Sequence, residues 1–141
     1  MINDNLTLTG AVSIAVNDEV VQEIPNLVVT TGKNFVSSRM KDTTKGAMSH
    51  MAVGTGTTAA AAGNTTLVTE LDRNALTSTT VTNNEIAYVC TWAAGDGTGA
   101  ITEAGLFNAS SGGDMLCRTV FSVVNKGSAD SMTITWTITV S

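Results

Sequence analysis

The chain has 141 residues, of which 43% are hydrophobic and only 13% charged, and its formal net charge is −5. Phosphate binding needs several cations on one face, and the seven Lys and Arg residues are scattered, so nucleic acid is not an expected partner. No apolar run approaches the roughly 18–20 residues that span a bilayer, so no membrane partner is expected.

Thr and Ser supply much of the polarity that charged residues supply in most proteins. Hydroxyl groups can lie on a β surface or in an interface without the desolvation penalty of a charge. Such a surface is compatible with contact to other subunits, and equally with a Thr-rich β domain that makes no such contact.

Two segments near the N-terminus have the period of two that predicts strands. Apolar residues alternate with small and hydroxyl residues over 6–16, and a turn candidate at 17–18 leads into a returning strand over 19–24. A Pro-Asn pair ends that strand, and residues 27–30 are a candidate for a short further strand.

A helical pattern interrupts the strands. One short helix is expected near 33–40, with Thr31 as its cap. Its apolar residues would pack onto the sheet edge: Phe35, Val36 and Met40. The polar residues 41–47 predict a surface loop.

The middle of the chain is rich in small residues. Residues 51–53 predict a strand, and 54–66 predict a loop of Gly, Thr and Ala that has little to bury and depends on its neighbours for order. One helical turn is expected over 67–71. A hairpin around an Asn-Asn turn then joins strands over 77–82 and 85–92.

The last eleven residues, 131–141, alternate without a break between an apolar side and a hydroxyl side. This pattern predicts an antiparallel strand with one buried and one wet face. After a strand over 101–107, we expect residues 115–124 and 131–140 to pair as a hairpin through 126–128. The hydroxyl side of the last strand would face either solvent or another subunit.

These elements predict a single mainly β domain over 1–141, an antiparallel β-sandwich or barrel of jelly-roll-like type. The expected core consists of large residues on one face of their strands: Tyr88, Cys90, Trp92, Phe107, Phe121, Ile134, Trp136 and Ile138. Cys90 and Cys117 are expected to be free buried thiols, with a disulfide between neighbouring strands as the alternative.

The sequence contains no convergent set of residues for catalysis, so we expect no enzyme, no cofactor and no metal site. Gly54-x-Gly56 lacks the Lys and Ser/Thr of a nucleotide loop. Asp96 has no spaced carboxylate partners for calcium, and His50 is the only histidine.

Three carboxylates could form a catalytic pair if the fold brought them together: Glu70, Asp72 and Glu103. Nothing in their spacing fixes their separation. We expect instead that Glu70 and Asp72 are solvated and that Glu103 pairs with a cation such as Arg118.

An ordered set of short segments resembles small structural proteins of tailed bacteriophages. The likeness covers roughly residues 50–141 and depends on 53–58, Leu67, Glu70-Leu71, Arg73, 101–107, 115–121, Lys126 and 132–138. The resemblance implies a virion location, a β-rich fold and, commonly, a homotrimer. It implies no catalytic residues.

Within that family, a short chain without a fibre shaft or receptor tip fits a capsid decoration (cement) protein. Such a protein, made in the host bacterial cytoplasm, binds the outside of the shell of major capsid protein and stabilises the head. A short polar arm is the candidate capsid contact: Met1, Ile2, Asn3, Asp4 and Asn5.

Two other functions remain open on the sequence. One is a tail, neck or fibre-attachment protein of the virion. The other is a carbohydrate-binding β-sandwich, in which Tyr88, Trp92 and Trp136 would stack on sugars if they were exposed. Their alternation places them in the core instead.

Overall fold

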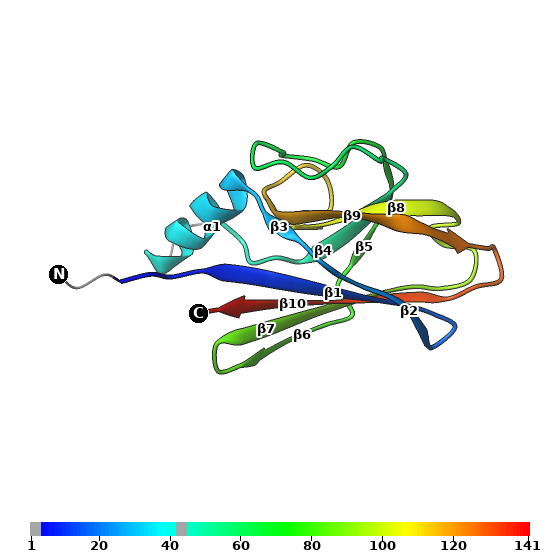
Figure 1. The fold of residues 1–141 in the computed structure, drawn as a ribbon, viewed down its shortest axis with the longest axis horizontal. Coiled ribbons are helices and arrows are strands. Elements are labelled where there is room, and N and C mark those ends of the chain that lie inside the picture. Colours follow the sequence, from blue (N-terminus) through cyan, green and yellow to red (C-terminus); the bar gives the residue numbers. More distant parts are fainter. Residues whose placement is uncertain (1–3, 42–44) are drawn as a thin grey trace.

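A computed structural model describes residues 4–41 and 45–141 (Figure 1). These residues form two five-stranded antiparallel sheets, in the orders β2-β1-β10-β7-β6 and β3-β9-β8-β4-β5, and one helix. The elements are β1 (Leu8–Val16), β2 (Glu19–Pro25), β3 (Leu27–Val28), α1 (Thr30–Met40), β4 (His50–Gly54), β5 (Glu70–Ala75), β6 (Ser78–Thr82), β7 (Glu85–Trp92), β8 (Gly99–Phe107), β9 (Met115–Lys126) and β10 (Met132–Val140). The prediction of a mainly β antiparallel fold with one short helix is confirmed.

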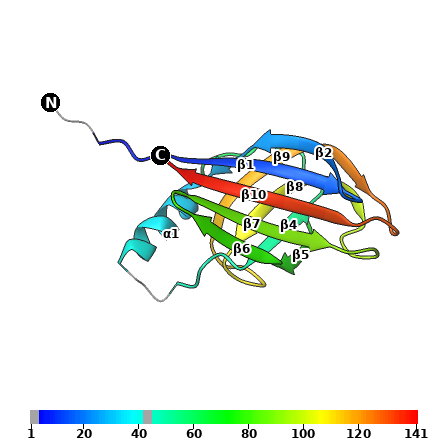
Figure 2. The same ribbon diagram turned by 90° about the horizontal axis from the view of Figure 1, so that it is seen from below.

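The first sheet follows the predicted hairpins. β1 and β2 join through Asn17 and Asp18, which both have positive φ, a conformation that Asn and Asp tolerate in tight turns. β6 and β7 form the hairpin expected around Asn83 and Asn84. β10 lies between β1 and β7 and pairs with both along its length (Figure 2).

The predicted hairpin between the last two strands is wrong. β9 pairs with β8 and β3, whereas β10 pairs with β1 and β7 in the other sheet. Alternation fixes which face of a strand is buried, but it does not fix which strand lies beside it. The two apolar faces therefore meet across the core rather than side by side.

A buried lysine holds the turn that carries the chain from one sheet to the other. Lys126, at the end of β9, is 1% exposed, and its Nζ donates to the carbonyl oxygens of Ala93 at 3.0 Å and Asp130 at 2.7 Å. The Asp130 carboxylate in turn accepts the N–H of Gly127. These bonds direct residues 127–131 toward β10 in the opposite sheet.

The helix differs in detail from its prediction. It begins at Thr30, Val29 precedes it as N-cap, and no side chain caps it, so Thr31 is not the cap. Phe35 is buried and Val36 is half-buried against the core, but Met40 is 82% exposed and does not pack on the sheet. The last helical turn simply extends beyond the edge of the sandwich.

A second local correction concerns residues 67–71. They form no helical turn: residues 67–69 are irregular, and β5 begins at Glu70 and pairs with β4. The apolar spacing that suggested a helix comes from Leu67, which is buried, and Leu71, which is 43% exposed.

The apolar faces of the two sheets meet in one continuous cluster. All eight predicted core residues are buried, none more than 8% exposed: Tyr88, Cys90, Trp92, Phe107, Phe121, Ile134, Trp136 and Ile138. Seven of them belong to this cluster, whereas Phe107 lies in a second, smaller cluster with Leu67 and Met115. Cys90 and Cys117 are buried and free, as expected.

Little of the predicted N-terminal arm can be placed. Met1, Ile2 and Asn3 lie outside the described residues, while Asp4 and Asn5 are exposed and lead into β1. Thr7 exchanges backbone hydrogen bonds with Ser141, so the segment just before β1 lies beside residue 141. No helix among the described residues is long and apolar enough to cross a membrane.

Replacing Trp136 by Asp should abolish folding. Trp136 is fully buried, and loss of a large core side chain removes about 3–5 kcal/mol before the penalty of a buried carboxylate is added. That total approaches the whole stability of a typical domain. Near-ultraviolet circular dichroism and size-exclusion chromatography report the loss.

Thr137→Asp is the matched control, because Thr137 is the next residue of β10 and is only half-buried on the opposite face. We expect it to fold with a loss of about 1 kcal/mol. A native-like Trp136→Asp protein would contradict the assignment of faces in β10.

Candidate functional site: a buried ion pair that holds the 55–69 loop

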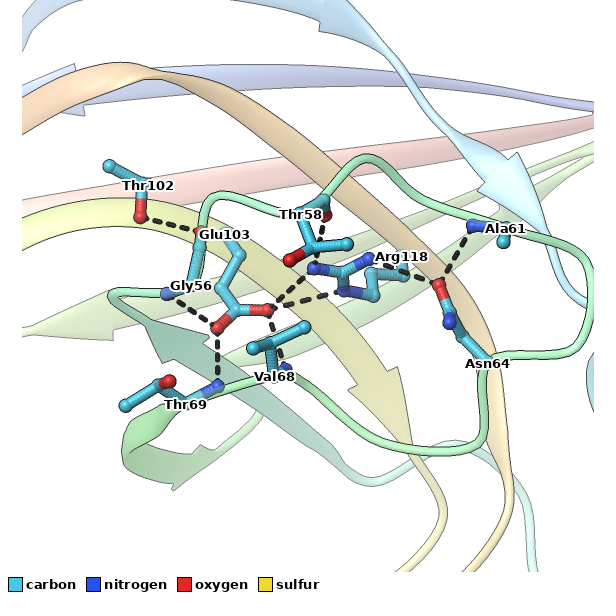
Figure 3. Close-up of polar contacts among 9 residues, drawn as sticks. All are labelled: Gly56, Thr58, Ala61, Asn64, Val68, Thr69, Thr102, Glu103 and Arg118. Carbon is cyan, nitrogen blue, oxygen red and sulfur yellow. Dashed lines mark hydrogen bonds and ion pairs between the residues drawn. The ribbon is translucent and has the colours of Figure 1, made fainter.

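The segment between β4 and β5, called here the 55–69 loop, covers part of the outer face of the sheet that contains β8 and β9 (Figure 3). Leu67 is its main buried apolar side chain and packs in a small cluster with Phe107 and Met115. One leucine cannot order so long a segment, because each fixed residue costs about 1–2 kcal/mol of backbone entropy. Polar contacts must hold the rest.

Glu103, on β8, binds both ends of the loop. Its side chain is 0% exposed, and Oε2 accepts the backbone N–H groups of Gly56 and Thr69, each at 2.8 Å. Its other oxygen, Oε1, accepts the N–H of Val68 at 2.9 Å. One carboxylate thus replaces the strand partners that these loop amides lack.

Arg118, on β9, binds the middle of the loop. Its guanidinium lies 3.0 Å and 3.2 Å from Glu103 Oε1 and is itself fully buried. The same group donates to the carbonyl of Thr58 at 2.8 Å and to Asn64 Oδ1 at 3.0 Å. Asn64 Oδ1 also accepts the N–H of Ala61, which closes a turn inside the loop.

The two glycines of the Gly54-x-Gly56 segment make room for this carboxylate. A Cβ added at Gly56 would lie 2.3 Å from Glu103 Oε2, and one at Gly54 would lie 2.7 Å from the same atom. Thr102 Oγ1 donates to the Gly56 carbonyl at 2.8 Å. The Gly54-x-Gly56 spacing, which resembles part of a phosphate-binding loop, therefore accommodates the Glu103 carboxylate of the chain itself.

The hydrogen bonds keep the buried carboxylate charged. Burial acts to raise the pKa of Glu103, but the backbone donors of Thr69, Val68 and Gly56 and the Arg118 guanidinium outweigh it. The pKa of Glu103 is therefore held below its ordinary value. At neutral pH the site is a fully ionised pair.

A second arginine, Arg73, links β5 to the turn between β8 and β9. Arg73, on β5, pairs with Glu70 at 2.6 Å and lies over the ring of Phe107, 3.8 Å from its centroid. It also donates to the carbonyls of Ala109 and Gly112 in the turn between β8 and β9. Arg73 thus ties β5 to that turn.

Asp72 is not solvated as predicted. It is half-buried against Asp96, and burial together with the Asp96 hydrogen bond and negative charge raises the pKa of Asp72. Hydrogen bonds from Asn74, at 2.7 Å, and from Asp72 lower the pKa of Asp96. The two pKa values are thus moved apart, so Asp72 is the carboxyl of this pair that binds a proton first.

The remaining candidate groups do not assemble into a reactive set. His50 Nδ1 lies 2.8 Å from Ser49 Oγ, and neither side chain has a hydrogen bond to a carboxylate of the described residues. Burial raises the pKa of Cys90 to about 12 and that of Cys117 further, which keeps both as thiols. Within residues 4–41 and 45–141, no three His, Cys, Asp or Glu side chains are grouped to hold a metal ion.

The sequence predicted the centre of this site but not its periphery. The expected pairing of Glu103 with Arg118 is confirmed. Asn64 and Thr102 were missed, since an Asn after Gly reads as an ordinary turn and a Thr in a strand as an ordinary strand residue. Only the tertiary fold brings them to the loop.

The fold and this site define a two-sheet antiparallel β protein in which a buried ion pair holds a long surface loop. No protein family model, curated protein or solved structure matches the chain.

Removing both partners of the Glu103–Arg118 pair should cost less than the sum of the losses from removing each alone. Arg118→Met leaves a buried carboxylate without its counter-charge, for which we expect a loss of about 3–5 kcal/mol. The double variant Glu103→Gln/Arg118→Met should lose less than the sum of the single losses. Urea unfolding followed by tryptophan fluorescence measures the loss in Arg118→Met, in Glu103→Gln and in the double variant.

Lys45→Met is the control for this cycle. Lys45 and Asp114 are separated by 2.7 Å but are partly exposed, so the loss should not exceed about 1 kcal/mol. Strictly additive losses at Glu103 and Arg118 would contradict a coupled pair.

Acid should release the loop through Glu103. Because its folded pKa is depressed, the stabilisation is fully present above the ordinary glutamate pKa of 4.5 and is lost as the pH falls through the folded value. The backbone amide signals of Gly56, Val68 and Thr69 should therefore titrate together below pH 4.5 in NMR spectra.

Glu103→Gln is the control, since its amide side chain does not titrate in this range. The three signals should then lose their common midpoint. A common midpoint above the ordinary glutamate value in the unaltered protein would contradict the depressed pKa.

Proposed function

We propose that this chain is a capsid decoration protein, which binds the outside of a shell of major capsid protein and stabilises it. The observation that carries the proposal is the outer face of the sheet β2-β1-β10-β7-β6. That face is broad, nearly uncharged and not covered by any other described part of the chain.

The composition of this face follows from the register. Cross-strand rows place Ser13, Thr135, Val89 and Ser78 side by side, and next to them Ala11, Thr137, Ala87 and Thr80. Charges enter only at Glu23 and Glu85. Low charge density and many hydroxyl groups allow close contact with another protein without stripping water from ions.

The face is also hollowed where a partner side chain could enter. β1 presents Gly10, Ala11 and Ser13 between the larger residues of β2 and β10. A shallow groove of about 470 Å³ results, which reaches from Glu23 and Pro25 to Thr135 and Thr137. Shape of this kind favours a protein contact over a flat, solvated sheet.

The buried ionic groups support a structural role. Arg118 and Lys126 are buried, and both donate to backbone carbonyls of the chain itself. Arg73 does the same in the turn after β8. These cationic side chains thus stabilise the protein's own fold. A rigid protein that binds only the assembled shell stabilises that shell by mass action.

The carbohydrate-binding alternative loses its main support. All aromatic side chains of the chain are 8% exposed or less: Phe35, Tyr88, Trp92, Phe107, Phe121 and Trp136. None offers a ring face on which a sugar could stack. The number of copies per virion distinguishes the other alternative, a tail, neck or fibre-attachment protein, from a decoration protein.

Purified protein should bind empty heads that lack it, at hundreds of copies per shell, and raise the temperature at which the heads open. Quantitative mass spectrometry of the particles and differential scanning calorimetry measure the two effects. A dozen copies or fewer per virion would instead identify a tail or neck component.

The same assay locates the contact. Thr135→Lys puts a charge in the middle of the outer face and should reduce occupancy, whereas Ser110→Lys, in the exposed turn before β9, should not. Deletion of residues 1–5 tests the arm. Unchanged occupancy after that deletion would remove the arm from the contact.

A further inference from the structure

The outermost strands of the two sheets differ in how they are protected from pairing with another chain. β2 carries Glu19, Glu23 and Pro25, and its Gln22 side chain donates to the Ser122 carbonyl of β9. β3 is only two residues long. β5 carries three charged residues in six: Glu70, Asp72 and Arg73. Charge, proline, short length and side-chain cover are the usual protections of sheet edges.

β6 has none of these protections. Its sequence is Ser-Thr-Thr-Val-Thr, all of its residues are exposed, and it pairs only with β7. Figure 2 shows it as the outermost strand of its sheet. No register shift interrupts its pairing with β7, so the strand is regular to its end.

The inward side of β6 is also incompletely covered. Val81 lies opposite Ile86 and therefore on the side of the core, yet it is 69% exposed. Ile86 on the next strand is half-buried. β6 thus extends past the opposite sheet, and an apolar side chain and an edge of unpaired backbone groups face solvent together.

We propose that β6 pairs with β6 of a second copy of this chain, antiparallel about a two-fold axis. The two copies then share one continuous sheet, in which each β6 becomes an inner strand. This contact concerns a sheet edge and does not depend on the function proposed above.

The absence of charge on this edge favours a second copy of the acidic chain as the occupant. The chain has a net charge of −5, yet no charged residue occurs over 74–84. Two copies can therefore approach through this segment without placing like charges opposite each other. An unrelated acidic or basic partner would find no counter-charge there.

The register follows from maximal overlap. With both five-residue strands fully paired, Thr80 faces Thr80 of the second copy, and Thr79 faces Val81. Thr80 points to the outer face of the sheet, as Ala87 and Thr137 do. The pairing places a Thr–Thr contact on that face and brings each Val81 under the sheet of its neighbour.

The contact is small, so we expect weak self-association. Two five-residue strands lie at the low end of interface sizes, for which dissociation constants of about 10–1000 μM are typical. Sedimentation velocity over a concentration series should show a monomer–dimer equilibrium in this range.

A charge-exchange pair of variants tests the register. Thr80→Lys and Thr80→Glu each place like charges opposite each other across the two-fold axis, and each should weaken association roughly fivefold or more. An equimolar mixture of the two should associate again, because Lys then faces Glu. Thr9→Lys, on the same face of the sheet but on an inner strand, should leave association unchanged.

Recovery in the mixture can arise only if residue 80 of one copy meets residue 80 of the other. A chain that remains monomeric to millimolar concentration overturns the proposal. So does an oligomer that Thr80→Lys and Thr80→Glu leave unchanged, since its interface would lie elsewhere. Circular dichroism of each variant verifies that the overall β structure is retained.

Discussion

The buried pair of Glu103 and Arg118 is the interaction on which the outer layer of this protein depends. The 55–69 loop is made of small and hydroxyl residues that cannot bury enough apolar surface to order themselves. Hydrogen bonds to ionised groups contribute about 1.5–3 kcal/mol each, and this pair makes them to the beginning, middle and end of the loop. Two side chains, both fully buried, therefore replace the hydrophobic contacts that the loop lacks. Replacing either one leaves the other charged group buried without its partner, so the arrangement tolerates change poorly.

The 55–69 loop makes the two sheets differ in how far their outer faces are covered. β8 is buried on both faces over most of its length, because the core covers one face and the loop covers part of the other. β10, in the opposite sheet, alternates between buried and half-buried residues from Met132 to Thr139. One sheet is thus an inner layer of the molecule, and the other keeps a free outer face of threonine, serine and alanine. The hydroxyl side of β10 belongs to that free face, where the described chain leaves it uncovered.

The sequence predicts those features of this structure that depend on residues close together in the chain. Alternation predicted β10 and its buried face, and the β6–β7 hairpin followed from its turn. The expectation that Glu103 pairs with a cation such as Arg118 is also confirmed. The neighbours of β9 and β10 were mispredicted, because an alternating strand pairs equally well within a sheet or faces another across a core. The ordering of the loop could not be foreseen either, since Asn64, Thr58 and Gly56 are brought to the ion pair only by tertiary structure.

The expectation of a phage structural protein depends on segments that contain most of the residues holding the 55–69 loop. Gly54, Gly56, Arg73, Glu103 and Arg118 all lie in them, and each has a structural reason to be where it is. A likeness carried by such residues supports a shared way of holding a loop on a sheet more directly than it supports a shared partner. We therefore place the proposed contacts with partners in exposed residues that do not hold this loop. These residues form the outer face around β1 and β10, where the charges are Glu23 and Glu85, and the uncharged edge at β6. Low charge density suits contacts between proteins better than contacts with nucleic acid, which need clustered cations.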